Sequence, residues 1–209
     1  LYILDLEDED AEPEMIEVDG SVQHVEWSPA GDRLAVSVTP RELVDDTLMF
    51  NRVRIVSTEG KVLGRVENPG KLGDFVWSPS GEHLAMIATE SAHDPAAGRL
   101  IVTGKNGGAM TNLLPDLMGH VRAIGWMDPR TVLFISHEGV ESRLATIGVN
   151  GRNERTLLPL GGPIWNRFSV SDRGDIALLA TTPEHPTEVY RLERGDSRAD
   201  RVTDSNPWL

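Results

Sequence analysis

Histidines are the first side chains to consider for chemistry, because imidazole is the commonest transition-metal ligand in proteins. The sequence has six, at His24, His83, His93, His120, His137 and His185. No two have the i, i+4 spacing of a zinc site on a helix, and the chain has no cysteine to supply a thiolate. The pattern therefore predicts neither a metal site nor a cofactor, and it favours a capping or turn role for His120.

A dense acidic segment near the N-terminus is the second candidate. Residues 7–10 read Glu-Asp-Glu-Asp, and Glu12 and Glu14 follow. Calcium loops have an alternating Asp-x-Asp-x-Asp-Gly order that gathers oxygens around one ion, and this segment lacks that order. We expect a solvated hairpin tip here.

Nucleophilic catalysis would need an activated serine on a strained strand-to-helix turn. No Gly-x-Ser-x-Gly phrase occurs in the 209 residues, and the strand-turn-helix context of that nucleophile elbow is missing as well. The prediction is that this chain carries no catalytic residue.

A repeated phrase marks the elements that would position any functional side chain. Trp-Ser-Pro-x-Gly begins at Trp27 and at Trp77, and a related Trp-Met-Asp-Pro phrase begins at Trp126. The intervals are 50 and 49 residues, and a degenerate copy begins at Val170, 44 residues further on. Periods of about 40 to 50 residues with all-β patterning are typical of β-propeller blades.

Four strands are expected in each repeat. A half-polar strand precedes the turn, and the turn leads into a wholly apolar run that favours a strand buried on both sides. A third strand and a polar fourth strand follow, joined by turns that contain glycine. The apolar runs are residues 34–38, 84–88, 132–135 and 176–180. Ser169 to Gly174 faintly resembles a sialidase Asp-box, but it lacks the aromatic residue and is interpreted as the decayed fourth copy.

The first repeat is incomplete, because residues 1–6 resemble a third strand and residues 15–18 a fourth. The expected fold class is all-β, a partial β-propeller of four-stranded antiparallel blades with about four full blades and an outer half blade. The expected ranges are 1–20 for the half blade and about 21–69, 70–119, 120–162 and 163–206 for the blades. An open arc leaves apolar faces unpaired at its ends, so we expect self-association or low stability in solution.

Position in the repeat also suggests roles for single residues. Trp27, Trp77 and Trp126 are expected to pack between adjacent blades, since tryptophan supplies a large apolar area. Glu26 and Asp74 lie near inner strands, where a propeller glycosidase would need two carboxylates, but no motif positions them.

Two long connections, residues 40–51 and 89–98, join second to third strands and should therefore lie on the same face of the propeller. Their mixture of apolar and charged groups fits a surface that meets another domain or a peptide. The alternative is a pair of ordinary solvated loops. The candidate partner- or substrate-facing residues are Asp45, Asp46, Met49, Phe50, His93 and Asp94.

Composition narrows the choice of partner. With 20 lysines and arginines against 33 aspartates and glutamates, the formal charge is −13, which would repel a phosphate backbone and argues against nucleic acid. No apolar run approaches the roughly 20 residues that cross a bilayer, so a membrane is not expected as partner. The sequence is compatible with a cytoplasmic or a periplasmic location, and of the two we favour the periplasm.

Several segments are similar to those of a known family: the repeated phrase, the two long connections, and above all residues 185–190 and 201–206. They resemble the propeller of the prolyl oligopeptidase family of serine peptidases. The acylaminoacyl-peptidase-like branch is the most similar. The resemblance spans nearly the whole chain, although the Trp-Ser-Pro-x-Gly phrase is shared with TolB-like periplasmic proteins and other WD40-like propellers.

The resemblance implies a non-catalytic propeller that gates access to a hydrolase. In that family an α/β-hydrolase domain with the catalytic Ser, Asp and His follows the propeller, here after residue 209. The implied partners are that hydrolase domain and short peptide substrates, with no cofactor. The alternative is a TolB-like binding propeller, which acts as a protein-interaction scaffold without a hydrolase domain.

Overall fold

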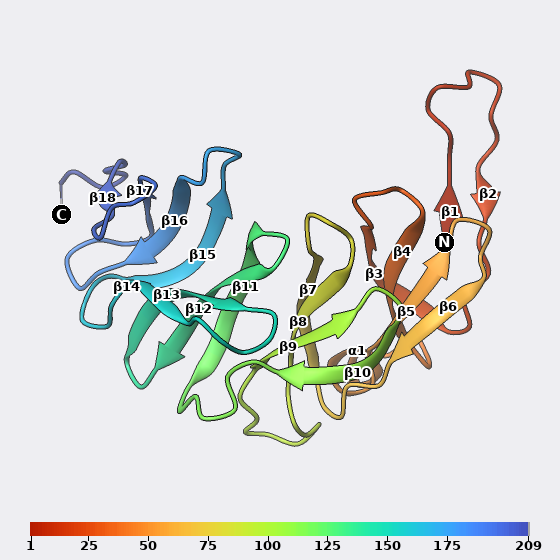
Figure 1. Ribbon diagram of the computed structural model, residues 1–209, viewed down its shortest axis with the longest axis horizontal. Helices are drawn as coiled ribbons and strands as arrows, with labels where there is room; N and C mark the ends of the chain where they lie inside the picture. The colour runs from red at the N-terminus through yellow and green to blue at the C-terminus, as the bar shows by residue number, and fades with distance from the viewer. Residues whose placement is uncertain (209) are drawn as a thin grey trace.

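The computed structural model describes residues 1–208, and its regular structure is almost entirely antiparallel β-sheet. Four four-stranded sheets follow a short two-stranded one, and in every sheet the strands pair in chain order. Figure 1 shows the sheets side by side along an arc, with the N-terminal strands at one end and the C-terminal sheet at the other. Within residues 1–208 no sheet closes on itself.

The strands have the following bounds. The N-terminal pair is β1 (Tyr2–Ile3) and β2 (Glu14–Met15). The first sheet is β3 (Ser21–Trp27), β4 (Arg33–Thr39), β5 (Arg52–Ser57) and β6 (Val62–Val66). The second sheet is β7 (Leu72–Trp77), β8 (His83–Ala88), β9 (Arg99–Gly104) and β10 (Gly107–Asn112). The third sheet is β11 (His120–Asp128), β12 (Thr131–Glu138), β13 (Glu141–Gly148) and β14 (Arg155–Leu158). The fourth sheet is β15 (Ile164–Val170), β16 (Ile176–Thr181), β17 (Glu188–Leu192) and β18 (Asp200–Arg201).

The turn between the first two strands is the same in the first and second sheets, and the fourth sheet has a shorter form of it. In the first sheet Ser28 N–H donates to the Arg33 carbonyl, and Gly31 N–H donates to the Ser28 carbonyl, both at 2.9 Å. Gly31 has a φ of +69°, which glycine adopts without steric cost. Ser78 makes the equivalent bonds. In the fourth copy Gly174 N–H still donates to the Ser171 carbonyl, but Ser171 N–H donates to Asp175, so this copy keeps a serine turn that is one residue shorter and has lost its tryptophan and proline.

Apolar side chains fill each boundary between consecutive sheets. Phe75 and Trp77 pack with Val53 between the first and second sheets, and equivalent clusters join the second to the third and the third to the fourth. A fourth cluster, which includes Ile16, joins the N-terminal pair to the first sheet. The core is therefore a series of inter-sheet layers, as is typical of a propeller-like fold.

Burial of the repeated tryptophans differs from the prediction. Trp77 and Trp126 are buried between sheets, and their indole N–H groups donate at 3.2 Å to the backbone carbonyls of Glu26 and Val76 in the preceding sheet. Trp27, however, is 49% exposed. The prediction was wrong for Trp27 because the N-terminal pair has no inner strand to cover it.

A second correction concerns the last apolar run. The second strands β4, β8 and β12 are buried along almost their whole length, as predicted. In β16 buried and exposed residues alternate, and Ala177 and Leu179 are exposed. The third sheet covers one side of the fourth, and no described residue forms a sheet on the other side.

Candidate functional site

The first predicted connection, residues 40–51, contains a short helix, α1 (Val44–Met49), where only a loop was expected. Asp46 explains its compactness: its carboxylate is buried and accepts two bonds from the Arg41 guanidinium, at 2.9 and 3.0 Å. The Arg41 bonds lower the pKa of Asp46 below its usual value. Asp46 is thus occupied within the segment, whereas Asp45 and Phe50 are exposed and Met49 is half-buried.

The second predicted connection, residues 89–98, presents His93 and Asp94 to solvent. Asp94 forms a 2.5 Å ion pair with Lys71, which lies between β6 and β7. Lys71 N–H also donates to Thr89 Oγ1 at 2.6 Å. On the other side of the same link, Arg52 donates to the Gly70 carbonyl at 3.2 Å. The link at residues 70–71 therefore contacts the second predicted connection, and it contacts Arg52, which directly follows the first.

His120 has a more specific role than the sequence suggested. Its Nδ1 accepts a 2.8 Å bond from Gly98 N–H, and Val121 N–H donates to the Gly98 carbonyl at 2.9 Å. Partial burial lowers the pKa of His120, in keeping with a neutral ring that accepts at Nδ1. His120 thereby holds the end of the second connection against the third sheet.

A cavity of about 520 Å³ lies among the inner strands. Its lining includes Glu26 and Asp74, the two carboxylates that the sequence placed near inner strands. His24 bonds Glu26 at 2.9 Å and packs edge-on against the Phe75 ring, with centroids 5.2 Å apart. Arg167 completes the lining from β15 in the fourth sheet. We call this space the inner cavity.

The inner cavity has unused hydrogen-bonding capacity. Ser37 and Asn51 both line it and are buried, and within the described chain Ser37 Oγ and Asn51 Oδ1 have no hydrogen-bond partner. A buried polar atom without a partner is costly, so such atoms point to a ligand or an ordered water. Asp74 and Arg167 likewise form no ion pair with any described residue.

This chemistry suits binding of a polar molecule. The cavity offers a free carboxylate and a free guanidinium, and two of its lining residues have a buried oxygen without a partner. Among residues 1–208 no group of three or more histidines or acidic residues is arranged to hold a metal ion. Sequence reasoning missed Ser37, Asn51 and Arg167, because no local motif marks them and only the arrangement of the first and fourth sheets brings them together.

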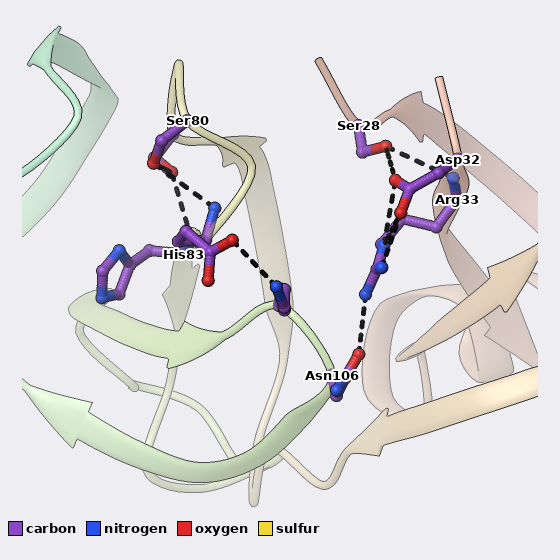
Figure 2. Close-up of polar contacts among 9 residues, drawn as sticks. Ser28, Asp32, Arg33, Ser80, His83 and Asn106 are labelled. Carbon is purple, nitrogen blue, oxygen red and sulfur yellow. Dashed lines mark hydrogen bonds and ion pairs between the residues drawn. The ribbon is translucent and has the colours of Figure 1, made fainter. Parts of the chain in front are cut away.

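A polar network links a turn of the first sheet to a turn of the second sheet (Figure 2). Asp32 accepts a 2.8 Å bond from the Ser28 hydroxyl and a 2.6 Å bond from Arg33, which also donates to Asn106 Oδ1 of the second sheet at 2.7 Å. The Arg33 bond, followed by the Ser28 bond, lowers the pKa of Asp32 to about 2. In Figure 2 the His83 ring lies apart from the serine hydroxyls, so these serines have no histidine base beside them. The role of the network is to connect the two sheets.

The C-terminal segment that the sequence singled out is attached to β17 by a buried carboxylate. Glu188 accepts bonds from the Thr203 hydroxyl, from Ser205 N–H at 2.8 Å and from the Ser205 hydroxyl at 3.1 Å. The Thr203 bond is the main cause of a lowered pKa at Glu188. Residues 203–205 are therefore held in a defined place on the fourth sheet.

The fold is β-propeller-like, and comparison with solved structures agrees. No family model and no curated protein sequence matches the chain. A putative TolB from Agrobacterium tumefaciens is similar at a TM-score of 0.65 and 16% identity over 89% of this chain and 63% of its own. A Mycobacterium tuberculosis puromycin-hydrolyzing peptidase is similar at 0.66 and 15%, over 91% of this chain and 30% of its own.

An oligogalacturonate lyase in complex with manganese is similar at a TM-score of 0.67 and 17% identity, over 97% of this chain and 58% of its own. At these identities the likeness describes the fold alone. The chain spans between 30% and 63% of the length of these three proteins. Among the described residues no helix is long and apolar enough to cross a bilayer.

Proposed function

We propose that this chain is the non-catalytic, substrate-gating propeller of a serine peptidase of the prolyl oligopeptidase family that cleaves short peptides. The four sheets and the N-terminal pair are then four blades and an outer half blade of a larger propeller, and a hydrolase domain follows residue 209. The observation that carries the proposal is the inner cavity, a space between inner strands that is lined by charged residues and by residues with unpartnered polar atoms.

Two further observations support this reading. One is the likeness of the fold to a solved peptidase. The other is the Glu188 anchor, which gives the chain a fixed point of exit from the fourth sheet. A propeller at such a junction restricts by its shape which peptides reach the reaction site, and it keeps folded proteins out.

The reading frame beyond the codon for Leu209 provides the test. We expect a Gly-x-Ser-x-Gly hydrolase domain there, a full-length product that cleaves short peptides but not folded proteins, and no peptidase activity in the 209-residue chain. A frame that ends there, or that continues into an unrelated domain, contradicts the proposal.

The inner cavity can be tested in the full-length product. Arg167→Gln removes the free guanidinium, and we expect KM for peptides to rise by about tenfold, as for loss of one charged hydrogen bond. Arg173→Gln is the matched control, because Arg173 lies exposed in the turn of the same sheet and outside the cavity. Equal kinetics for both variants would exclude the cavity from peptide binding.

The second candidate is a TolB-like scaffold that binds another protein, favoured by the likeness to the solved structure of a putative TolB. The periplasm is the compartment that this candidate favours. Recovery of one cell-envelope protein with the intact gene product, together with a reading frame that lacks a hydrolase, would support it over the peptidase.

A further inference from the structure

A second cavity, of about 420 Å³, lies at the boundary between the third and fourth sheets. The connection at residues 159–163 forms one wall, and residues 197–199 together with Arg201 form another. Trp165 and Tyr190 also line it; they are 3% and 6% exposed, and their rings meet edge to face with centroids 5.3 Å apart. This volume lies within the range typical of small-molecule sites. We call it the aromatic cavity.

One residue that lines this cavity has a buried donor without a partner. Trp165 Nε1 is buried and makes no hydrogen bond to any described residue. Trp77 and Trp126, by contrast, donate their indole N–H groups to backbone carbonyls. Since an unmade bond at a buried N–H group costs free energy, Trp165 is suited to a ligand that brings an acceptor.

The backbone of Trp165 is firmly held. Its N–H donates to Ser142 Oγ at 2.8 Å, and its carbonyl accepts from His137 Nε2 at 2.8 Å. Both partners belong to the third sheet. The indole is thus presented by a rigid backbone, and a ligand that bonds Nε1 does not have to order it.

The charged groups that line the cavity are both cationic. Arg198 and Arg201 line it, and no described carboxylate does, although the chain as a whole carries −13. Their own partners are weak: Arg201 contacts Asp204 at 3.1 Å and Arg198 contacts Asp200 at 3.8 Å, and both aspartates are largely exposed. Exposed pairs of this kind contribute little, so an incoming anion can compete for the guanidinium groups.

We propose that the aromatic cavity binds a small molecule with a flat apolar body and a carboxylate. The body packs on Trp165 and Tyr190, and the carboxylate accepts bonds from Trp165 Nε1 and a guanidinium. Two sources have this chemistry, a free arylalkanoic acid and the C-terminus of a peptide that ends in an aromatic residue. This site is separate from the inner cavity and does not depend on the proposed function.

The test is a titration of the ¹⁵N-labelled chain, observed at the tryptophan indole resonances. Trp165→Phe identifies the Trp165 resonance by its disappearance. We expect millimolar 3-phenylpropanoate to shift it, and 3-phenylpropanamide, which lacks the charge, to bind about tenfold more weakly. The Trp126 resonance is the internal control, because its N–H is already bonded to Val76.

Peptide probes distinguish the two sources. If Gly-Gly-Phe with a free carboxylate binds more tightly than 3-phenylpropanoate, the natural ligand is a peptide C-terminus; the reverse order indicates a free acid. Arg201→Gln should weaken binding as read at the Trp165 resonance, with circular dichroism to check that the variant folds. Tyr190→Phe, which keeps the ring, should still bind. Absence of any Trp165 shift with all three probes, or equal binding of acid and amide, overturns the proposal.

Discussion

Two tryptophans at the same position in their repeats lie in opposite environments. Trp77 lies at the boundary between the first and second sheets, and Trp27 lies on the side of the first sheet that no four-stranded sheet of the described chain covers. Trp77 is 5% exposed and donates to the Glu26 carbonyl, while Trp27, at the same position in its repeat, is 49% exposed. Both precede the same serine turn with the same hydrogen bonds. The local phrase therefore determines the turn, and the neighbouring sheet determines whether the indole is buried.

In the fourth sheet, at the other end of the arc, burial also depends on whether a neighbouring sheet is present. Leu179 of β16 is 37% exposed, whereas Ile87 of β8 and Ile135 of β12 are buried. Their strands have similar apolar sequences. The second and third sheets each pack against a four-stranded sheet on both sides, whereas within residues 1–208 the first and fourth do so on one side only. Equivalent substitutions should therefore change the free energy of unfolding by different amounts.

The largest effect is expected from the tryptophans. Trp77→Ala leaves a cavity between two sheets and an unpaired Glu26 carbonyl, and should lower the free energy of unfolding by about 3 to 5 kcal/mol. Trp27→Ala removes a half-exposed ring and should cost less than about 1 kcal/mol. Urea denaturation measures both. Similar losses for the two variants would mean that Trp27 is covered in solution.

A smaller effect is expected at a close approach between the second and third sheets. A Cβ on Gly98 would lie 2.7 Å from Ile87 Cγ2 and 2.9 Å from His120 Cε1. Gly98→Ala should therefore destabilise by about 1 to 3 kcal/mol through overpacking. Gly104→Ala is the matched control, since a Cβ there meets no atom within 4 Å. If the two variants unfold at the same urea concentration, the boundary is looser than described.

The open ends should also promote self-association. Leu179→Lys places a charge on the uncovered face of the fourth sheet and should weaken association by about tenfold, or about 1.4 kcal/mol. Met118→Lys, at a fully exposed position in the connection after β10, should leave it unchanged. Light scattering over a concentration series gives both values. A chain that stays monomeric throughout would contradict the expectation.

The smallest effect is a dependence on pH through His120. Its pKa is lowered in the folded chain, so the unfolded chain binds more protons, and stability falls as pH drops below the unfolded value of about 6.5. Much of the residue is exposed, which keeps the change small. Thermal melts between about pH 7.5 and about pH 5.5 should show the loss.

His120→Asn is the variant for this prediction, because its Oδ1 can still accept from Gly98 but does not titrate. It should lose less stability over the same interval. An equal loss in the variant would assign the pH dependence to other groups.

Much of the fold could be predicted because its signals are local. The glycines of the hairpins have the positive φ expected of them, as Gly60 at +84° and Gly151 at +72° do. The serine turns and the order of four strands per repeat also follow from short phrases. Helix α1 was missed because it depends on the ion pair between Arg41 and Asp46, which no hydrophobic period marks.

The candidate site was less predictable. Glu26 and Asp74 could be placed near inner strands from their position in the repeat, and both line the inner cavity. Arg167 could not be added to them, because it lies 93 positions after Asp74 and reaches the cavity only when the sheets are stacked.

By itself, the sequence determined the strand meanders, the turns and the common placement of the two long connections, because these depend on residues a few positions apart. Only the tertiary structure decided that Trp27 is exposed, that Asp46 is turned inward and that Trp165 has a buried donor without a partner. Burial and hydrogen-bond satisfaction are properties of the boundary between two sheets, and each boundary is made by residues from separate parts of the chain.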